Sequence, residues 1–122
     1  DVEYLGFISD SELVSYYQKA TACFLMSKYE GFGFPLLEAY SFNCKVVRHL
    51  ENEVFDEISG KLDFSVSDKS LSDPNLEENL RLYFNKETDL SQHLLSFDWQ
   101  EVAQKYGKVI NQMLYPDSLK RN

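Results

Sequence analysis

The stretch from residue 27 to residue 39 limits what this chain can fold into more than any other part of the sequence. It follows a continuous apolar run at 22–26, which is typical of a strand. Gly31 and Gly33 are separated by one residue, and glycine lets a backbone adopt positive φ or approach another segment closely. Pro35 suits the first turn of a helix, because its missing N–H costs nothing there. The stretch therefore predicts a strand, a glycine loop and a helix N-terminus whose amides and positive dipole favour a phosphate.

Two carboxylates flank this helix start. The helix after Pro35 is apolar on almost every side, which predicts that it is buried. A carboxylate on such a helix must be paired or must face a water-filled cleft. Glu30 precedes the helix and Glu38 lies one turn inside it, so one interpretation is a ligand site with two carboxylates. The other interpretation is that Glu38 only complements the helix dipole and that Glu30 is a solvated loop residue.

Strand and helix signals alternate along the rest of the chain. Ser9 and Glu12 form a capping box, Asn43 suits a left-handed helix end, and Asp73 with Pro74 marks another helix start. The predicted strands lie at 2–8, 22–26, 45–47 and 62–66, and the predicted helices at 9–20, 35–43, 53–58, 74–84, 90–95 and 98–113. The continuous apolar run of the second strand predicts burial on both faces, and the alternation in the fourth predicts an edge strand.

This alternation predicts an α/β fold, a Rossmann-like parallel sheet with flanking helices, in a single domain over residues 1–122. Ligands of such sheets bind at the carboxyl ends of the strands. The loop 27–33 lies at such an end, so it is the first candidate for a ligand site.

Composition and charge exclude several classes of protein. The net charge of −8 argues against a nucleic-acid partner, which requires a basic surface. Cys23 and Cys44 lie in or beside apolar strands and are predicted to be buried free thiols. His49 and His93 have no Cys or His neighbours at ligand spacing, so no metal site is expected.

The sequence contains no run of about 18 apolar residues and no signal peptide, so no transmembrane segment is expected. The expected location is the cytoplasm, with peripheral attachment at the inner membrane face left open for a longer protein. The first residue, Asp1, directly precedes a predicted strand, which suggests a piece of something longer.

The run from Glu30 to Ala39 resembles the Glu-x7-Glu signature of the retaining GT-B glycosyltransferases of family four, the glycosyl transferases group 1. The resemblance extends on both sides, to Leu5-Gly6-Phe7, Cys44-Lys45-Val46-Val47 and Phe97-Asp98-Trp99. It implies the C-terminal, donor-binding lobe of a GT-B fold, in part. The first strands of this lobe and the N-terminal acceptor domain would then be absent from the chain.

The resemblance also implies roles for the residues of the motif. A nucleotide-diphosphate-sugar donor would bind at the helix N-terminus, with Glu38 accepting hydrogen bonds from the ribose hydroxyls. Glu30 would lie beside the transferred sugar as the catalytic carboxylate. The implied donor-binding backbone comprises Gly31, Phe32 and Gly33 at the sugar, and Leu36 and Leu37 at the diphosphate. No bound metal is expected for the transfer.

The resemblance further implies an acceptor that is a glycan, a lipid-linked saccharide or a small molecule, held by the absent domain. The chain alone would be inactive and would associate with itself. Two alternatives remain open: a non-catalytic nucleotide-binding or interaction module of the same fold, and another GT-B enzyme such as an epimerase or phosphorylase. Lys28 and His49 are interpreted as loop residues without function, His93 as a surface residue and Trp99 as a core residue.

Overall fold

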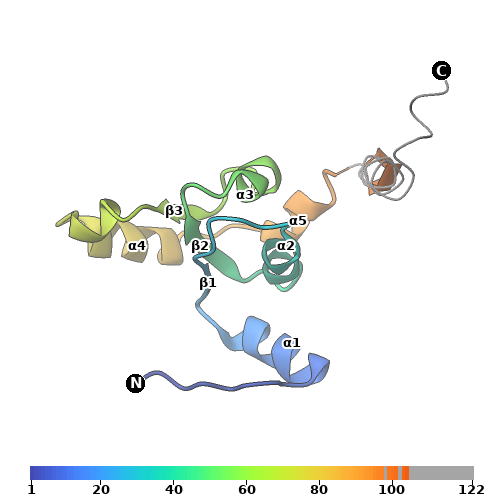
Figure 1. Ribbon diagram of the computed structural model, residues 1–122, viewed down its shortest axis with the longest axis horizontal. Coiled ribbons are helices and arrows are strands. Elements are labelled where there is room, and N and C mark those ends of the chain that lie inside the picture. Colours follow the sequence, from blue (N-terminus) through green and yellow to red (C-terminus); the bar gives the residue numbers. More distant parts are fainter. Residues whose placement is uncertain (98, 102, 105–122) are drawn as a thin grey trace.

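The computed structural model describes residues 1–97, 99–101 and 103–104. Three parallel strands alternate with helices over these residues (Figure 1). In chain order the elements are α1 (Asp10–Lys19), β1 (Ala22–Leu25), α2 (Phe34–Ser41), β2 (Lys45–His49), α3 (Glu53–Ile58), β3 (Phe64–Val66), the short 3-10 helix η1 (Ser70–Ser72), α4 (Leu76–Asn85) and α5 (Leu90–Leu94).

The sheet has the order β1-β2-β3, and both pairs of neighbouring strands are parallel. Parallel neighbours need a crossover, and here α2 connects β1 to β2 while α3 connects β2 to β3. Cys23 lies opposite Val46, and Val47 lies opposite Phe64. The predicted α/β class, a Rossmann-like parallel sheet with flanking helices, is therefore confirmed.

The hydrophobic core lies between one face of the sheet and the helices α2 and α5. Its buried side chains are Leu36, Ala39, Tyr40, Cys44, Val46, Phe55 and Leu90. Within it the hydroxyl of Tyr40 donates to the carbonyl of Ser59 at 3.1 Å, which satisfies the one polar atom of that ring. The thiols of Cys23 and Cys44 are both free, as the sequence predicted; Cys44 is buried as expected, whereas Cys23 is only half-buried.

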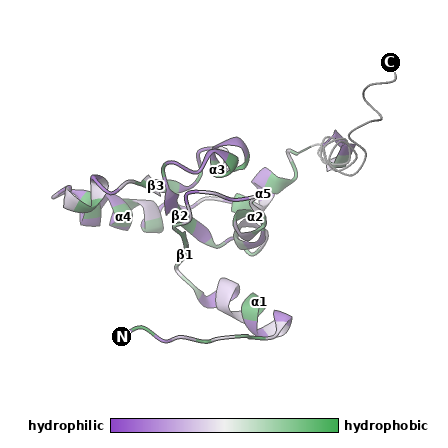
Figure 2. Cartoon of the chain, viewed as in Figure 1, coloured by the Kyte–Doolittle hydropathy of each residue, from purple (hydrophilic) through white to green (hydrophobic). Residues whose placement is uncertain are grey.

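Helix α4 packs on the other side of the sheet, so that helices flank both faces (Figure 1). The ammonium of Lys45 donates to the carbonyls of Tyr83 and Phe84 at the end of α4, at 2.6 and 2.7 Å. A cation at a helix C-terminus satisfies carbonyls that have no partner within the helix. Figure 2 shows hydrophobic and hydrophilic residues mixed along α4, as in an amphipathic helix on the surface.

Helix α1 stands apart from the sheet (Figure 1) and contacts α2 through Tyr17. The ring of Tyr17 stacks on that of Phe42 with centroids 5.9 Å apart, and its hydroxyl donates to Glu38 at 3.2 Å. The predicted capping box is confirmed: the Ser9 side chain accepts from the Glu12 amide and the Glu12 carboxylate accepts from the Ser9 amide. No residue of α1 is buried. The capping box therefore stabilises the helix itself but does not attach it to the core.

The predicted strand at 2–8 is wrong, because these residues form an exposed coil beside α1. A strand requires a neighbouring strand for its backbone hydrogen bonds, and among the described residues β1 pairs only with β2. The predicted burial of the run 22–26 is also wrong, since Phe24 is 60% exposed. Phe24 shares its sheet face with Val47 by register, and α4 covers that face over β2 and β3 but leaves β1 uncovered.

The elements after residue 43 follow the predictions closely. Asn43 ends α2 with φ of +56°, α3 spans the predicted residues, and β3 is an edge strand. The predicted core position of Trp99 is wrong, because this side chain is 47% exposed. The predicted helix 98–113 lies largely outside the described residues.

Candidate functional site

The glycine loop lies at the carboxyl end of β1 and leads into α2, as the sequence predicted. Gly33 is the N-cap of α2 with φ of +72°, in the left-handed region that favours glycine. A Cβ at Gly33 would lie 2.5 Å from a methyl group of Ile58 and 3.2 Å from one of Val54. Gly31 is different, since a Cβ there would meet no atom within 4 Å. Gly33 therefore lets the loop pack on α3, while the loop is open at Gly31.

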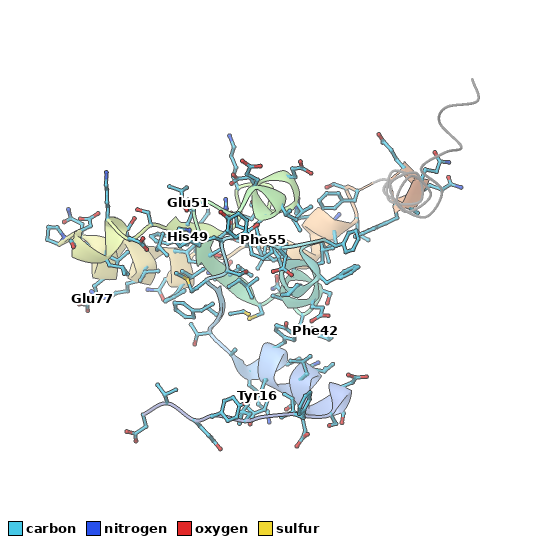
Figure 3. The ribbon with its side chains drawn as sticks, in the orientation of Figure 1. Tyr16, Phe42, His49, Glu51, Phe55 and Glu77 are labelled. Carbon is cyan, nitrogen blue, oxygen red and sulfur yellow. The ribbon has the colours of Figure 1, made fainter. Side chains whose placement is uncertain are left out.

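Glu30 lies beside a pocket of about 430 Å³ at this end of the sheet. Its carboxylate accepts a hydrogen bond from the Ser27 hydroxyl at 3.2 Å. The pocket is lined by Lys28, Tyr29, Glu30, Glu51, Asn52, Glu53 and Val54. It is thus formed by the loop after β1 and by the start of α3, near the labelled Glu51 and Phe55 of Figure 3.

Glu38 points in another direction and does not line this pocket. Its carboxylate accepts the hydroxyl of Tyr17 from α1. Burial, the nearby Cys23 and the charge of Glu38 raise the pKa of Tyr17 well above its ordinary value, so this phenol stays protonated as a donor. The structure therefore gives the two carboxylates of the motif different partners: Glu30 has the Ser27 hydroxyl of its own loop, and Glu38 has the Tyr17 hydroxyl of α1.

The amides at the start of α2 are already engaged. Those of Leu36 and Leu37 both donate to the carbonyl of Gly33, at 3.1 and 3.3 Å. The second of these is the first ordinary bond of the helix, and the first is a tighter 3-10 bond. A phosphate at this helix end would therefore share these donors with the Gly33 carbonyl instead of meeting unpaired amides.

His49 is not a loop residue but the last residue of β2, and it is buried. Its Nδ1 accepts the amide of Glu51 at 3.2 Å, which leaves the proton of the neutral ring on Nε2. Nε2 lies 3.5 Å from a carboxylate oxygen of Asp68. Lys28 pairs with the same Asp68 at 3.7 Å and with Glu51 at 3.5 Å, so the pocket lysine is held by two acids.

His93 is not on the surface as predicted. Its Nε2 lies 2.9 Å from the carbonyl of Ile58, and its ring meets Tyr40 and Phe97 edge to face. A Cβ at Gly60 would lie 2.3 Å from this ring, so His93 packs closely beneath the turn after α3. Its role in the structure is to join α5 to α3.

Two residues that the sequence analysis did not single out hold the site together. Asn52 is 1% exposed: its side-chain oxygen caps α3 at the Phe55 amide, and its side-chain nitrogen donates to the Ser27 carbonyl at 2.9 Å. Arg48, also buried, donates to the carboxylates of Asp56 and Asp63 and to the Asn52 carbonyl at 3.2 Å.

Burial lowers the pKa of Arg48, but its hydrogen bonds to the two carboxylates outweigh this and raise it, so Arg48 stays charged. An Asn followed by an acidic helix is a recognisable cap signal, and would have identified the cap at Asn52. Nothing in the local sequence indicates its bond to Ser27.

The described residues contain no group of three or more His, Cys, Asp or Glu side chains that could hold a metal ion. Within the same part of the chain, no helix is long and apolar enough to cross a membrane.

A parallel α/β domain with a glycine loop and a carboxylate at the end of its first strand is an architecture that binds ligands at this edge of the sheet. Comparison with protein families makes this specific. The family model described as Glycosyl transferases group 1 matches residues 1–93, and the chain belongs to this family. No curated protein and no solved structure matches the chain. Glycosyl transfer is the general activity of this family.

Proposed function

We propose that the chain supplies the donor site of a retaining GT-B glycosyltransferase of family four, which transfers a sugar from a nucleotide-diphosphate-sugar to an acceptor. The observation that carries the proposal is the position of Glu30. It lies on the loop after β1, beside a 430 Å³ pocket, immediately before a helix N-terminus. This is the edge of a parallel sheet at which such folds bind ligands.

In this proposal Glu30 acts on the transferred sugar. A carboxylate beside the anomeric carbon stabilises positive charge that develops there and orients the sugar hydroxyls. The open side of Gly31 offers room for the sugar, since a Cβ there would meet nothing within 4 Å. The amides of Phe32 and Gly33 address the sugar hydroxyls, and the helix dipole of α2 supports the leaving diphosphate at Leu36 and Leu37.

Glu38 binds the ribose in this proposal. Its carboxylate already accepts one hydrogen bond from Tyr17, and a carboxylate has room for several donors. Tyr17 would fix the orientation of Glu38 while ribose hydroxyls take the remaining positions. We further propose that the reaction needs no bound metal, that the acceptor is a glycan, a lipid-linked saccharide or a small molecule held by a separate domain, and that the protein acts in the cytoplasm.

Two substitutions in the full-length protein test these roles. Glu30→Gln removes the charge beside the sugar, so we expect kcat to fall much more than donor KM rises. Glu38→Ala should weaken binding of a free nucleoside diphosphate by about 1–3 kcal/mol, the range for a lost charged hydrogen bond. Calorimetry with UDP, GDP and ADP, and release of these products from the matching hexose donors, give both values. An unchanged kcat in Glu30→Gln would refute the catalytic role, and an unchanged affinity in Glu38→Ala the binding role.

The second candidate is a non-catalytic nucleotide-binding or interaction module of the same fold. The ion pairs of Lys28 with Glu51 and Asp68 favour it, since they engage the one lysine that lines the pocket. Such a module would bind a nucleoside diphosphate and release none from any of the hexose donors.

A further inference from the structure

We propose that Asn52 is a positioning residue for Glu30, acting through Ser27, and that α3 is the platform on which the catalytic loop rests. This inference rests on the function proposed for Glu30. It names a residue outside the Glu-x7-Glu motif, contributed by the loop that follows β2.

The link from Asn52 to Glu30 consists of two hydrogen bonds. The Asn52 side-chain nitrogen donates to the Ser27 carbonyl at 2.9 Å, and the Ser27 hydroxyl donates to Glu30 at 3.2 Å. Asn52 and Glu30 also line the same pocket. Because Asn52 is 1% exposed, breaking its bond to Ser27 leaves a buried donor without its partner until the loop has opened far enough to admit water.

Both polar atoms of the Asn52 side chain are fixed, which makes it a rigid anchor. Its oxygen accepts the Phe55 amide at 3.2 Å and so caps α3, while its nitrogen faces the loop. Its backbone carbonyl accepts a hydrogen bond from the buried Arg48. Arg48 in turn holds Asp56 of α3 and Asp63 before β3, so the anchor is joined to two strands of the sheet.

The other end of the loop rests on the same helix. Gly33 lies so close to Ile58 and Val54 of α3 that a Cβ has no room there. The loop is therefore held at both ends by α3, at Ser27 by a hydrogen bond and at Gly33 by packing. Between these ends Lys28 pairs with Glu51 and Asp68, while a Cβ at Gly31 would meet no atom within 4 Å. The bond from the Ser27 hydroxyl is the contact that acts on the Glu30 carboxylate itself.

The test uses Asn52→Asp in the full-length protein. This substitution keeps the oxygen that caps α3 and removes the nitrogen that donates to Ser27. We expect amide hydrogen exchange of residues 27–33 to accelerate at least about tenfold while that of 53–58 is retained, since one buried hydrogen bond is lost. We expect kcat for nucleoside diphosphate release to fall about tenfold with donor KM little changed, because a misplaced group acts on the transition state.

Asn75→Asp is the matched control. Asn75 also stands at a helix N-cap, is exposed and makes no side-chain cap bond, so the same change of charge should leave exchange and kcat as in the wild type. Ser27→Ala is the second variant and covers the case in which Asn52→Asp does not fold. It keeps the Ser27 carbonyl and removes the bond to Glu30, so kcat should fall while loop exchange stays slow.

The proposal is overturned if Asn52→Asp shows the same loop exchange and the same kcat as Asn75→Asp. It is also overturned if Ser27→Ala keeps the wild-type kcat. Failure of the proposed function has a different signature. In that case Glu30→Gln releases nucleoside diphosphate at the wild-type rate, while the exchange measurement still reports whether Asn52 holds the loop.

Discussion

The same substitution, glycine to alanine, should affect stability very differently at the two glycines of the loop. Gly33→Ala places a Cβ 2.5 Å from Ile58, on a residue with φ of +72°. The left-handed backbone costs an alanine about 1–2 kcal/mol, and forcing an extra carbon into packed surroundings costs about 1–3 kcal/mol more. Gly33→Ala should therefore lower the free energy of unfolding by about 2–5 kcal/mol. Gly31→Ala, which meets no atom within 4 Å, should change it by less than about 0.5 kcal/mol.

Urea unfolding followed by circular dichroism measures both variants. With a slope of about 2 kcal/mol per M, a loss of 3 kcal/mol lowers the midpoint by about 1.5 M. The midpoint of Gly31→Ala should stay within about 0.3 M of the wild type, on the same slope. Equal midpoints for Gly33→Ala and wild type would refute the packing of the loop on α3, and an equal fall in both variants would refute the difference between the glycines.

Gly31→Ala has a second use in the full-length protein. Its methyl group projects into the open side of the loop, where the proposed function places the transferred sugar. We therefore expect Gly31→Ala to reduce sugar transfer although its stability is unchanged. Full transfer activity in a stable Gly31→Ala variant would mean that the sugar lies elsewhere.

Three further outcomes follow from the packing. Asp63→Asn should lower the free energy of unfolding by about 1–3 kcal/mol, because it removes the buried carboxylate that pairs with Arg48 and leaves Asp56 as its one charged partner. Asp56→Asn, at a side chain 55% exposed, should cost less than about 1 kcal/mol. Burial, with Cys44 and Glu38 nearby, raises the pKa of Cys23 from 9.0 to about 11. The neutral thiol therefore stabilises the fold fully below pH 9, and this contribution is lost between pH 9 and 11. A Cys23→Ala variant whose stability falls as steeply as that of the wild type over this range would refute the prediction. The outer edge of β1 pairs with no strand of the described residues and carries the exposed Phe24, so it should cause self-association. A monomer throughout a concentration series in analytical ultracentrifugation would contradict this.

Local sequence signals predicted the parts of the fold that local physics decides. Pro35 marked the first turn of α2, Asn43 the left-handed end of it, and Ser9 with Glu12 the cap of α1. Each signal depends on backbone preferences or hydrogen bonds within a few residues of itself. The glycine loop at the carboxyl end of β1 was predicted in the same way, as was the short helix α3.

Burial was predicted less well, because it depends on which other segments cover a residue. The apolar run at 22–26 predicted a strand covered on both faces, yet Phe24 and Met26 are exposed. The opposite error occurred at Arg48, which the sequence placed in a loop and which lies in β2, paired with two carboxylates. A hydrophobic pattern identifies buried apolar residues, so it does not identify a charged strand residue that is buried because carboxylates pair with it.

The motif spacing placed Glu30 and Glu38 on either side of a helix start, but spacing alone does not determine their surroundings. Glu30 depends on Asn52, which lies 25 residues from Ser27 in the chain, and Glu38 depends on Tyr17, 21 residues before it. The anchor of Glu30 is buried and joined to the sheet, whereas the partner of Glu38 belongs to a helix with no buried residue. A helix with no buried residue opens at a lower free energy than an element joined to the core. We therefore expect the environment of Glu38 to be the more readily altered of the two.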